Sequence, residues 1–363
     1  MRILEIRDLV VRFGSGPVTI HAVNGVSFEL EAGATLGLVG ESGCGKSVTS
    51  LAIMRLLPPG GRIEGGEILF EGQDLLSLSE PAMRGLRGKD VAMVFQDPMS
   101  SLNPVLTIEE QVTETIRAHE EVSRKVARAR AVELLSQVGL PDPVGALARY
   151  PHEFSGGMRQ RVMIAIALAL EPKLLIADEP TTALDVTIQA QVLDLMRRLT
   201  RETGTSLILI THDLGVVAGI ADRVAVMYAG FIVEEGSASE LFARPRHPYT
   251  VGLLRSLPRP DTRLEHLTPI EGSPPDQRRP PHGCPFAPRC GWRLDICWSE
   301  MPRLVPGAAS SDPKGTAVPD HALACHNPVS GPEVLEGRPL RLGFAPAPAP
   351  EPSGRARDGV MGR

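Results

Sequence analysis

A glycine-rich octapeptide constrains this chain more than any other feature. Residues 40–47 read GESGCGKS, a pattern that binds phosphate when a strand ends in the loop and a helix begins after it. Both flanks are present, because residues 35–39 form an apolar run and residues 48–57 suit a helix. A chance glycine-rich turn is the alternative. The sequence therefore predicts a strand, a phosphate-binding loop and a helix in that order, with a site for a nucleoside triphosphate.

Each type of residue in this loop has a chemical reason to be there. Glycines let successive backbone N–H groups point at an anion, and the following helix N-terminus adds partial positive charge. Lys46 can reach the terminal phosphates, and Ser47 can offer its hydroxyl to Mg²⁺. The residues expected to contact the nucleotide are Gly40, Ser42, Gly43, Cys44, Gly45, Lys46, Ser47 and Val48.

Composition and charge narrow the class of protein. The chain has 363 residues, enough for one large or two ordinary domains, and its net charge of −5 does not indicate a dedicated nucleic-acid binder. Charges within the first eight residues argue against a signal peptide. The longest strongly apolar run, 162–170, is shorter than the ~18 to 20 residues of a membrane helix. We expect a soluble cytoplasmic protein.

Strand-like and helical segments alternate along most of the chain. Strand-like runs lie at 3–8, 26–30, 66–70, 91–95, 173–177, 206–210 and 223–228, and helical patterns lie at 107–138, 185–202 and 214–220. Such alternation predicts an α/β fold with a parallel sheet and helices on its faces. We expect a nucleotide-binding core of residues 1–98 and 163–245, with a helical subdomain inserted at 99–162.

Two carboxylates end the apolar run near residue 175. Asp178 and Glu179 then lie at the carboxyl end of a strand, where open α/β sheets bind ligands. Asp178 can hold Mg²⁺, and Glu179 can polarise the water that attacks the γ-phosphate. The alternative is a solvated acidic turn, which the phosphate loop upstream makes less favourable.

Three further segments have both a catalytic and a structural interpretation. Residues 155–157 read SGG before the apolar helix expected at 161–170, which suits a phosphate contact or an ordinary N-cap. Gln96 follows a strand, so its side-chain carbonyl can join the Mg²⁺ or water shell, or make a loop hydrogen bond. His212 also follows a strand and can donate to the γ-phosphate or serve as a structural histidine.

Taken in order, these motifs resemble the ATP-binding subunit of ABC transporters over roughly residues 1–245. The resemblance makes 40–47 the Walker A loop, Gln96 the Q-loop, Asp178 and Glu179 the Walker B pair, and His212 the switch histidine. It also assigns the signature to Ser155, Gly156 and Gly157, the D-loop to Ala183, Leu184 and Asp185, and the aromatic that stacks on adenine to Phe13. Met158 replaces the glutamine that commonly ends the signature, and the usual adenine-stacking tyrosine is absent.

The resemblance also implies an assembly. In such proteins two subunits pair head to tail, and each ATP lies between the Walker A loop of one subunit and the signature of the other. Closure of the dimer is transmitted to membrane-spanning partners. It therefore implies two membrane permease subunits, a second ATPase subunit that we expect to differ from this chain, and an extracytoplasmic substrate-binding protein acting indirectly. The chain would lie peripherally on the cytoplasmic face of the membrane.

The C-terminal part contains four of the five cysteines. Residues 246–330 resemble the C-terminal region of ATPase subunits from oligopeptide, dipeptide and nickel importers. Clustered cysteines in a reducing compartment favour a metal over disulfides. We expect a [4Fe–4S] cluster, with Zn²⁺ or metal-free thiols as alternatives, because the spacing is not that of a common zinc knuckle. The four residues are Cys284, Cys290, Cys297 and Cys325.

A metal would stabilise a proline-rich segment that is too poor in apolar residues to fold alone. The tail at 331–363 is expected to be disordered. The favoured function is an ATPase that energises the import of short peptides, with nickel or a nickel chelate as the alternative cargo. Two other hypotheses are a soluble ABC ATPase acting on nucleic acid or the ribosome, and a non-catalytic ATP-binding subunit. The single cassette argues against the former, and the intact acidic pair against the latter.

Overall fold

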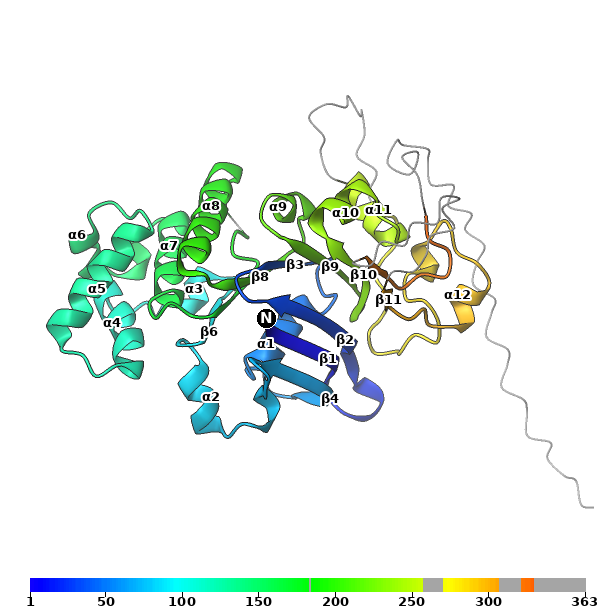
Figure 1. The fold of residues 1–363 in the computed structure, drawn as a ribbon, viewed down its shortest axis with the longest axis horizontal. Coiled ribbons are helices and arrows are strands. Elements are labelled where there is room, and N and C mark those ends of the chain that lie inside the picture. Colours follow the sequence, from blue (N-terminus) through cyan, green and yellow to red (C-terminus); the bar gives the residue numbers. More distant parts are fainter. Residues whose placement is uncertain (183, 257–269, 307–320, 330–363) are drawn as a thin grey trace, which may run out of the picture.

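An eight-stranded sheet carries the phosphate loop (Figure 1). The computed structural model describes residues 1–182, 184–256, 270–306 and 321–329. The order of the sheet is β11-β12-β10-β9-β3-β8-β7-β6. Its strands are β3 (Thr35–Val39), β6 (Val91–Val94), β7 (Leu174–Asp178), β8 (Ser206–Thr211), β9 (Arg223–Tyr228), β10 (Phe231–Ser237), β11 (Val305–Pro306) and β12 (Ala322–Leu323).

The predicted parallel sheet is confirmed for the strands around the phosphate loop. Parallel pairs join β3 to β8 and β9, β8 to β7, and β7 to β6. Every residue of β7 and β8 is buried, as expected for continuous apolar strands covered on both faces. Beyond β9 the sheet becomes antiparallel, since β10, β12 and β11 each run against their neighbours.

A second, antiparallel sheet was not predicted. Its order is β2-β1-β4-β5, formed by β1 (Arg2–Phe13), β2 (Ile20–Glu31), β4 (Gly61–Phe70) and β5 (Gln73–Asp74). The strands predicted at 3–8 and 26–30 are parts of longer ones. Register shifts interrupt the pairing of β1 with β2 at several points, and each shift breaks the two-residue alternation from which a strand is recognised.

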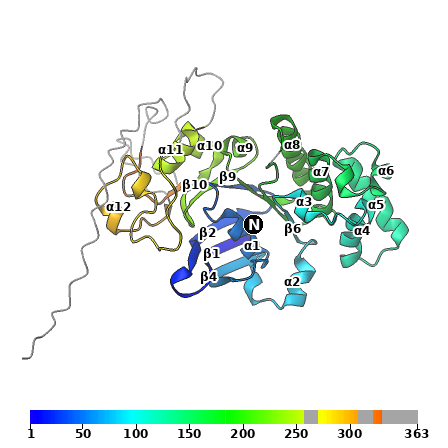
Figure 2. The ribbon, with the colours of Figure 1, turned by 180° about the vertical axis from the view of Figure 1, so that it is seen from behind.

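Helices cover the sheet, and one group of them lies to one side of it. Helix α1 (Lys46–Ile53) follows the phosphate loop, α2 (Glu80–Leu86) follows the antiparallel sheet, and α9 (Leu214–Ala218) follows β8. Between β6 and β7 the chain forms α3 (Pro98–Ser101), α4 (Ile108–His119), α5 (Arg124–Gln137), α6 (Pro143–Leu147) and α7 (Gly156–Ala167). These lie at one end of the molecule in Figures 1 and 2. Within the described ranges no helix is long and apolar enough to cross a membrane.

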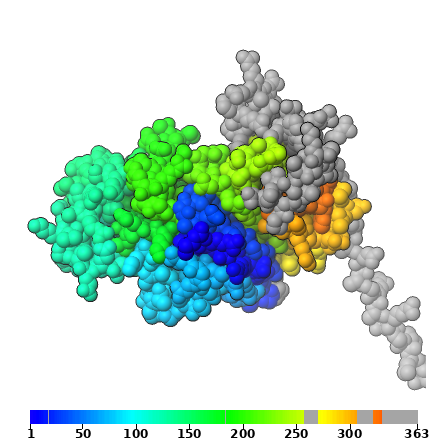
Figure 3. All heavy atoms as spheres, viewed as in Figure 1, coloured from blue at the N-terminus to red at the C-terminus, as the bar shows by residue number. Residues whose placement is uncertain are grey.

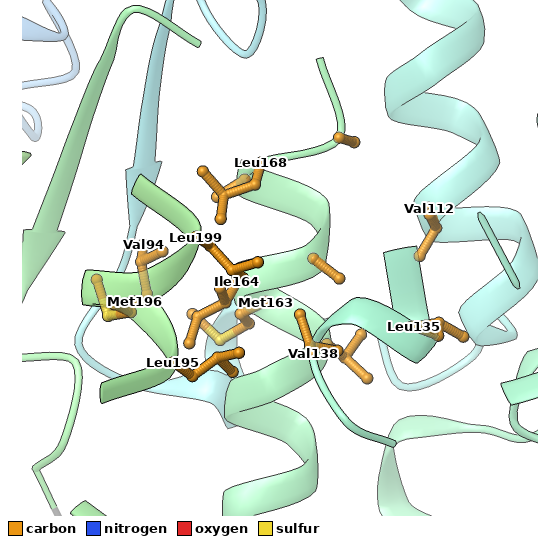
Figure 4. Packing of buried hydrophobic residues seen from close by; sticks show 14 of the residues in the cluster. Val94, Val112, Leu135, Val138, Met163, Ile164, Leu168, Leu195, Met196 and Leu199 are labelled. Atoms are coloured by element: carbon orange, nitrogen blue, oxygen red, sulfur yellow. The ribbon is translucent and has the colours of Figure 1, made fainter. Parts of the chain in front are cut away.

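A common apolar core joins these helices to the sheet. Figure 4 shows Val94 of β6, Ile164 of α7 and Leu199 of α8 (Val186–Thr203) close together in that core, and all three are buried. Helix α7 begins five residues before the predicted start, because the Ser155 hydroxyl caps it by accepting the backbone N–H of Met158 at 3.4 Å. The packing of α7 in this core therefore fixes the position of the Ser155–Gly157 segment at its N-terminus.

The C-terminal extension packs on the opposite end of the sheet (Figure 3). It includes α11 (Pro248–Arg255) and α12 (Ile296–Ser299), and α10 (Ala238–Ala243) precedes it. In agreement with the expectation that this segment cannot fold alone, its apolar residues pack into a core shared with β9 and β10. The rings of Tyr228, Tyr249 and Phe286 contact one another with centroids 4.6 to 5.4 Å apart. The predicted disordered tail at 331–363 lies outside the described residues.

One buried carboxylate fastens the extension to β10. Glu234 is fully buried, and its carboxylate accepts the backbone N–H groups of Arg246 at 2.7 Å and His247 at 3.0 Å. The same carboxylate lies 2.7 Å from Nε2 of His321, which immediately precedes β12. Such a group is stable when buried only if its lone pairs are satisfied. Glu234 therefore ties three parts of the chain together.

Candidate active site

The phosphate loop has a backbone that only glycine permits at two positions. Gly45 has φ of 109°, and a Cβ there would lie 2.4 Å from a carbonyl oxygen of β2. A Cβ at Gly40 would lie 2.1 Å from a carbonyl oxygen of β9. Inside the loop, Nζ of Lys46 donates to the backbone oxygens of Gly40 at 2.7 Å and Glu41 at 3.0 Å. The loop thus surrounds a buried ammonium group.

Oxygen ligands suitable for Mg²⁺ meet beside the loop. The Ser47 hydroxyl donates to Oδ1 of Asp178 at 2.9 Å, which links the start of α1 to the end of β7. Burial raises the pKa of Asp178, the bond from Ser47 lowers it, and the nearby charge of Glu179 raises it. A bound cation would favour the ionised carboxylate. A hydroxyl and a carboxylate are the hard oxygen donors that Mg²⁺ prefers, so the two residues fit the ion.

Three strands deliver polar side chains to Glu179. Its Oε2 accepts hydrogen bonds from Nε2 of Gln96 at 3.1 Å and from the Thr182 hydroxyl at 3.0 Å. Its Oε1 lies 3.5 Å from Nδ1 of His212. Gln96, Glu179 and His212 follow β6, β7 and β8, so the structure brings the three predicted catalytic residues together. Glu179 also has φ of 44°, a left-handed conformation that side chains rarely adopt.

The signature residues contact the start of α8 rather than the phosphate loop. A Cβ at Gly157 would lie 2.7 Å from the side chain of Ile188, so glycine allows α7 to approach α8 closely. Asp185 caps α8, because its Oδ1 accepts the backbone N–H of Ile188 at 2.9 Å. In the described part of the chain no hydrogen bond joins Ser155 to residues 40–47. Ala183 of the predicted D-loop lies outside the described residues.

The remaining predicted nucleotide contacts surround the loop. Phe13 ends β1, pairs with Ile20 and Gly61, and is partly buried. Val48 is also partly buried, in the first turn of α1. Ser42, Gly43 and Cys44 line a cavity of about 330 Å³, whose other wall includes residues 274–278 of the extension.

The four cysteines predicted to bind a metal lie in the C-terminal part of the chain as free thiols. The backbone N–H of Cys284 donates to the backbone oxygen of Cys297 at 2.8 Å. Cys290 and Cys297 are buried. The pKa of Cys290 and of Cys325 is raised to about 12, mainly by burial and partly by the neighbouring thiols. This environment favours neutral thiols over the thiolates that bind metals. Among the described residues, no group of three or more His, Cys, Asp or Glu side chains is arranged to hold a metal ion.

Contacts from the extension to the phosphate loop were not predicted. The Arg289 guanidinium donates to the Glu41 carboxylate at 2.6 and 3.0 Å. The Tyr249 hydroxyl accepts the backbone N–H of Glu41 at 2.8 Å, and Nε2 of Gln277 donates to the backbone oxygen of Gly43 at 2.8 Å. These partners are 208 to 248 positions apart in the sequence. No local pattern could have indicated them.

Comparisons with known proteins agree with these motifs. A model of the ABC transporter family matches residues 23–182, and one described as the C-terminal region of oligopeptide/dipeptide transporters matches residues 233–297. The chain is 55% identical to the dipeptide transport ATP-binding protein DppD of Bacillus subtilis, over 84% of this chain and 90% of that protein. It is 48% identical to the oligopeptide transport ATP-binding protein OppD of Escherichia coli, over 90% and 94% of the two chains.

Solved structures of ATP-binding cassettes share the fold. A dimer of the cassette MJ0796 bound to ADP and phosphate matches with a TM-score of 0.59 and 27% identity, over 65% of this chain and 98% of that chain. The cbiO1 protein of Clostridium perfringens, part of an ABC transporter complex, matches with a TM-score of 0.57 and 27% identity, over 67% and 91% of the two chains. The predicted resemblance and the predicted fold class are confirmed. The chain belongs to the ABC transporter family, as an ATP-binding protein that carries the C-terminal region of oligopeptide/dipeptide transporters.

Proposed function

We propose that this chain binds and hydrolyses ATP and thereby energises the import of short peptides across a membrane. The observation that carries the proposal is the convergence of Gln96, Glu179 and His212 beside the Ser47 to Asp178 hydrogen bond. The peptide cargo rests on the relatives, which are named for dipeptide and oligopeptide transport.

The phosphate loop and its neighbours would hold the nucleotide. Backbone N–H groups of residues 40–48 and the ammonium of Lys46 would bind the phosphates. Ser47, Asp178 and the side-chain carbonyl of Gln96 would hold Mg²⁺, which when bound neutralises charge on the phosphate oxygens. Phe13 would stack on the adenine.

Glu179 is the proposed general base. Its carboxylate would accept a proton from the attacking water as the water oxygen bonds to the γ-phosphorus, while the bond from that phosphorus to the bridging oxygen breaks and ADP leaves. The hydrogen bonds from Gln96 and Thr182 to Oε2 hold the carboxylate in place, so that Oε1 lies toward His212. His212 would donate to the γ-phosphate and so link hydrolysis to the state of the nucleotide.

The signature would act on the ATP of a partner ATPase subunit. Ser155, Gly156 and Gly157 begin α7 and contact the α8 side of the molecule, without a hydrogen bond to this chain's own phosphate loop in its described residues. Asp185 lies at the neighbouring helix start. The similarity to a dimeric cassette supports a two-subunit site. The proposed complex contains two permease subunits and a second, different ATPase, with a substrate-binding protein acting indirectly, at the cytoplasmic face of the membrane.

Substitution of Lys46 tests the proposed function. We expect Lys46→Ala to weaken ATP binding about 10- to 100-fold, because a charge-assisted contact to phosphate is lost. ATP titration calorimetry on the full chain measures this, and ATP-driven uptake of a labelled dipeptide by the complex in proteoliposomes measures transport. A complex that hydrolyses ATP and accumulates nickel instead of peptide would change the cargo, and a wild-type chain that binds no ATP would overturn the proposal.

We also propose that the four C-terminal cysteines receive a metal centre, most simply [4Fe–4S], when the chain matures. The support is the donor set, four thiols in one region of a chain with no disulfides among its described residues. Anaerobic purification followed by iron, sulfide and zinc analysis is expected to give about four irons per chain, lost in Cys290→Ser. Stoichiometric zinc would change the metal, and a metal-free chain with full transport activity would reject the site.

A further inference from the structure

The extension reaches the phosphate loop through an ion pair whose arginine is buried. The side chain of Arg289 is 4% exposed, and its guanidinium makes two hydrogen bonds to the Glu41 carboxylate, at 2.6 and 3.0 Å. Glu41 is the second residue of the phosphate loop. A bidentate pair of this kind fixes orientation as well as distance. Arg289 therefore determines where the side chain of Glu41 lies.

Arg289 is itself held in one orientation. Its Nε donates to the backbone oxygen of Glu271 at 2.9 Å, and its Nη2 donates to that of Ile270 at 3.1 Å. Its Nη1 also lies 3.3 Å from the Tyr228 hydroxyl, on β9. The guanidinium cannot turn away from Glu41 without losing these bonds.

The loop backbone is held at two more points. The Tyr249 hydroxyl accepts the backbone N–H of Glu41, and the carbonyl oxygen of Glu41 accepts from Lys46. Further along, Gln277 donates to the backbone oxygen of Gly43, and the backbone oxygen of Gln277 accepts the N–H of His21 on β2. Residues of the extension therefore orient the backbone of the loop at Glu41 and at Gly43.

A cavity separates part of the phosphate loop from the extension. The cavity of about 330 Å³ lies between residues 42–44 of the loop and residues 274–278 of the extension. The loop is therefore held by a few directed polar contacts on this side.

We propose that the extension is a working part of the nucleotide site, with Arg289 and Gln277 as positioning residues for the phosphate loop. The inference deepens the proposed function and rests on the loop binding ATP. A loop that is already held in its binding shape loses less conformational freedom when the phosphates arrive, and this raises affinity. Arg289 and Gln277 contact Glu41 and Gly43 of the loop and not the proposed general base Glu179. We therefore expect their substitution to change ATP affinity and not the rate of the chemical step.

Gln277→Glu tests the inference without disturbing the interior. The new carboxylate cannot donate to Gly43, and it brings negative charge toward the phosphates. We expect the Kd for ATP to rise about tenfold, equivalent to about 1.4 kcal/mol, with an unchanged thermal unfolding midpoint because Gln277 is only partly buried and lies outside the apolar core. Gln73→Glu on the edge strand β5 makes the same charge change away from the loop and is the control.

Arg289→Ala provides the second test. We expect the KM for ATP in the assembled complex to rise about tenfold while kcat stays within about twofold, since ground-state binding alone is affected. Arg289→Lys should recover part of the affinity, because it restores the charge without the planar fork. His321→Ala is the matched control: it breaks the buried contact to Glu234 and loosens the extension from β10 without touching the loop.

The outcomes separate this inference from the proposed function. If Arg289→Ala and His321→Ala lower the unfolding midpoint alike and neither changes the KM, Arg289 is only structural and the inference fails. Normal ATP affinity in Gln277→Glu would also count against it. Loss of ATP binding in Lys46→Ala with normal binding in both positioning variants would leave the proposed function standing. Absence of ATP binding by the wild-type chain would remove both.

Discussion

Replacing Glu179 by Gln is expected to lower ATP hydrolysis in the assembled complex by on the order of 10² or more, while ATP binding stays intact. Gln is nearly isosteric with Glu, and its carbonyl oxygen can still accept the bonds from Gln96 and Thr182. It cannot take a proton from water. Phosphate release at saturating ATP measures the chemical step, and calorimetry measures binding.

Glu171→Gln is the matched control for this substitution. Glu171 also has a left-handed backbone, with φ of 50°, and it lies between α7 and β7. The same chemical change there should leave turnover unchanged. If Glu179→Gln retains nearly normal turnover, another group must activate the water, and Glu179 loses its proposed role.

Replacing Ser155 by Arg is expected to stop ATP-driven closure of the dimer and to lower hydrolysis by on the order of 10². The reason is that Ser155 is proposed to contact the ATP held by the partner subunit, where a large cation would block the approach of the two chains. ATP affinity of the isolated chain should change by less than about twofold, because among the described residues no hydrogen bond joins Ser155 to this chain's own phosphate loop. Light scattering with ATP measures closure.

The cap that Ser155 provides needs its own control. Ser123 caps α5 in the same way, because its hydroxyl accepts the backbone N–H of Val126 at 3.3 Å. Ser123→Arg therefore removes an equivalent cap, at a cost of about 1 kcal/mol. A large loss of ATP affinity in the isolated Ser155→Arg chain, with none in Ser123→Arg, would contradict a role for Ser155 in the partner's site.

The parts of the fold that could be predicted are those with an unbroken local pattern. The strand ending at Asp178 is a continuous apolar run, and the structure buries all of it. The antiparallel sheet was missed because register shifts between β1 and β2 break the alternation. The start of α7 was placed too late because the capping role of Ser155 was only one of two interpretations.

The part of the candidate site that could be predicted also depends on a local pattern, namely polar residues that directly follow apolar strands. The meeting of Gln96, Glu179 and His212 could be expected, since the carboxyl ends of neighbouring parallel strands share one edge of a sheet. The amide of Gln96 contacts Glu179 directly, whereas the prediction emphasised its carbonyl. The pairing of Glu41 with Arg289 could not be foreseen, because contacts between residues so far apart in sequence leave no periodic signal.

The wide separation of Glu41 and Arg289 has a consequence during synthesis. The two residues are 248 positions apart, and a ribosome adds about 5 to 20 residues per second, so Glu41 waits roughly 12 to 50 s for its partner. The strand, loop and helix around Lys46 are thus complete long before Arg289 is made. A chain whose translation stops short of Arg289 lacks the ion pair, so finished and unfinished products differ at the nucleotide site itself.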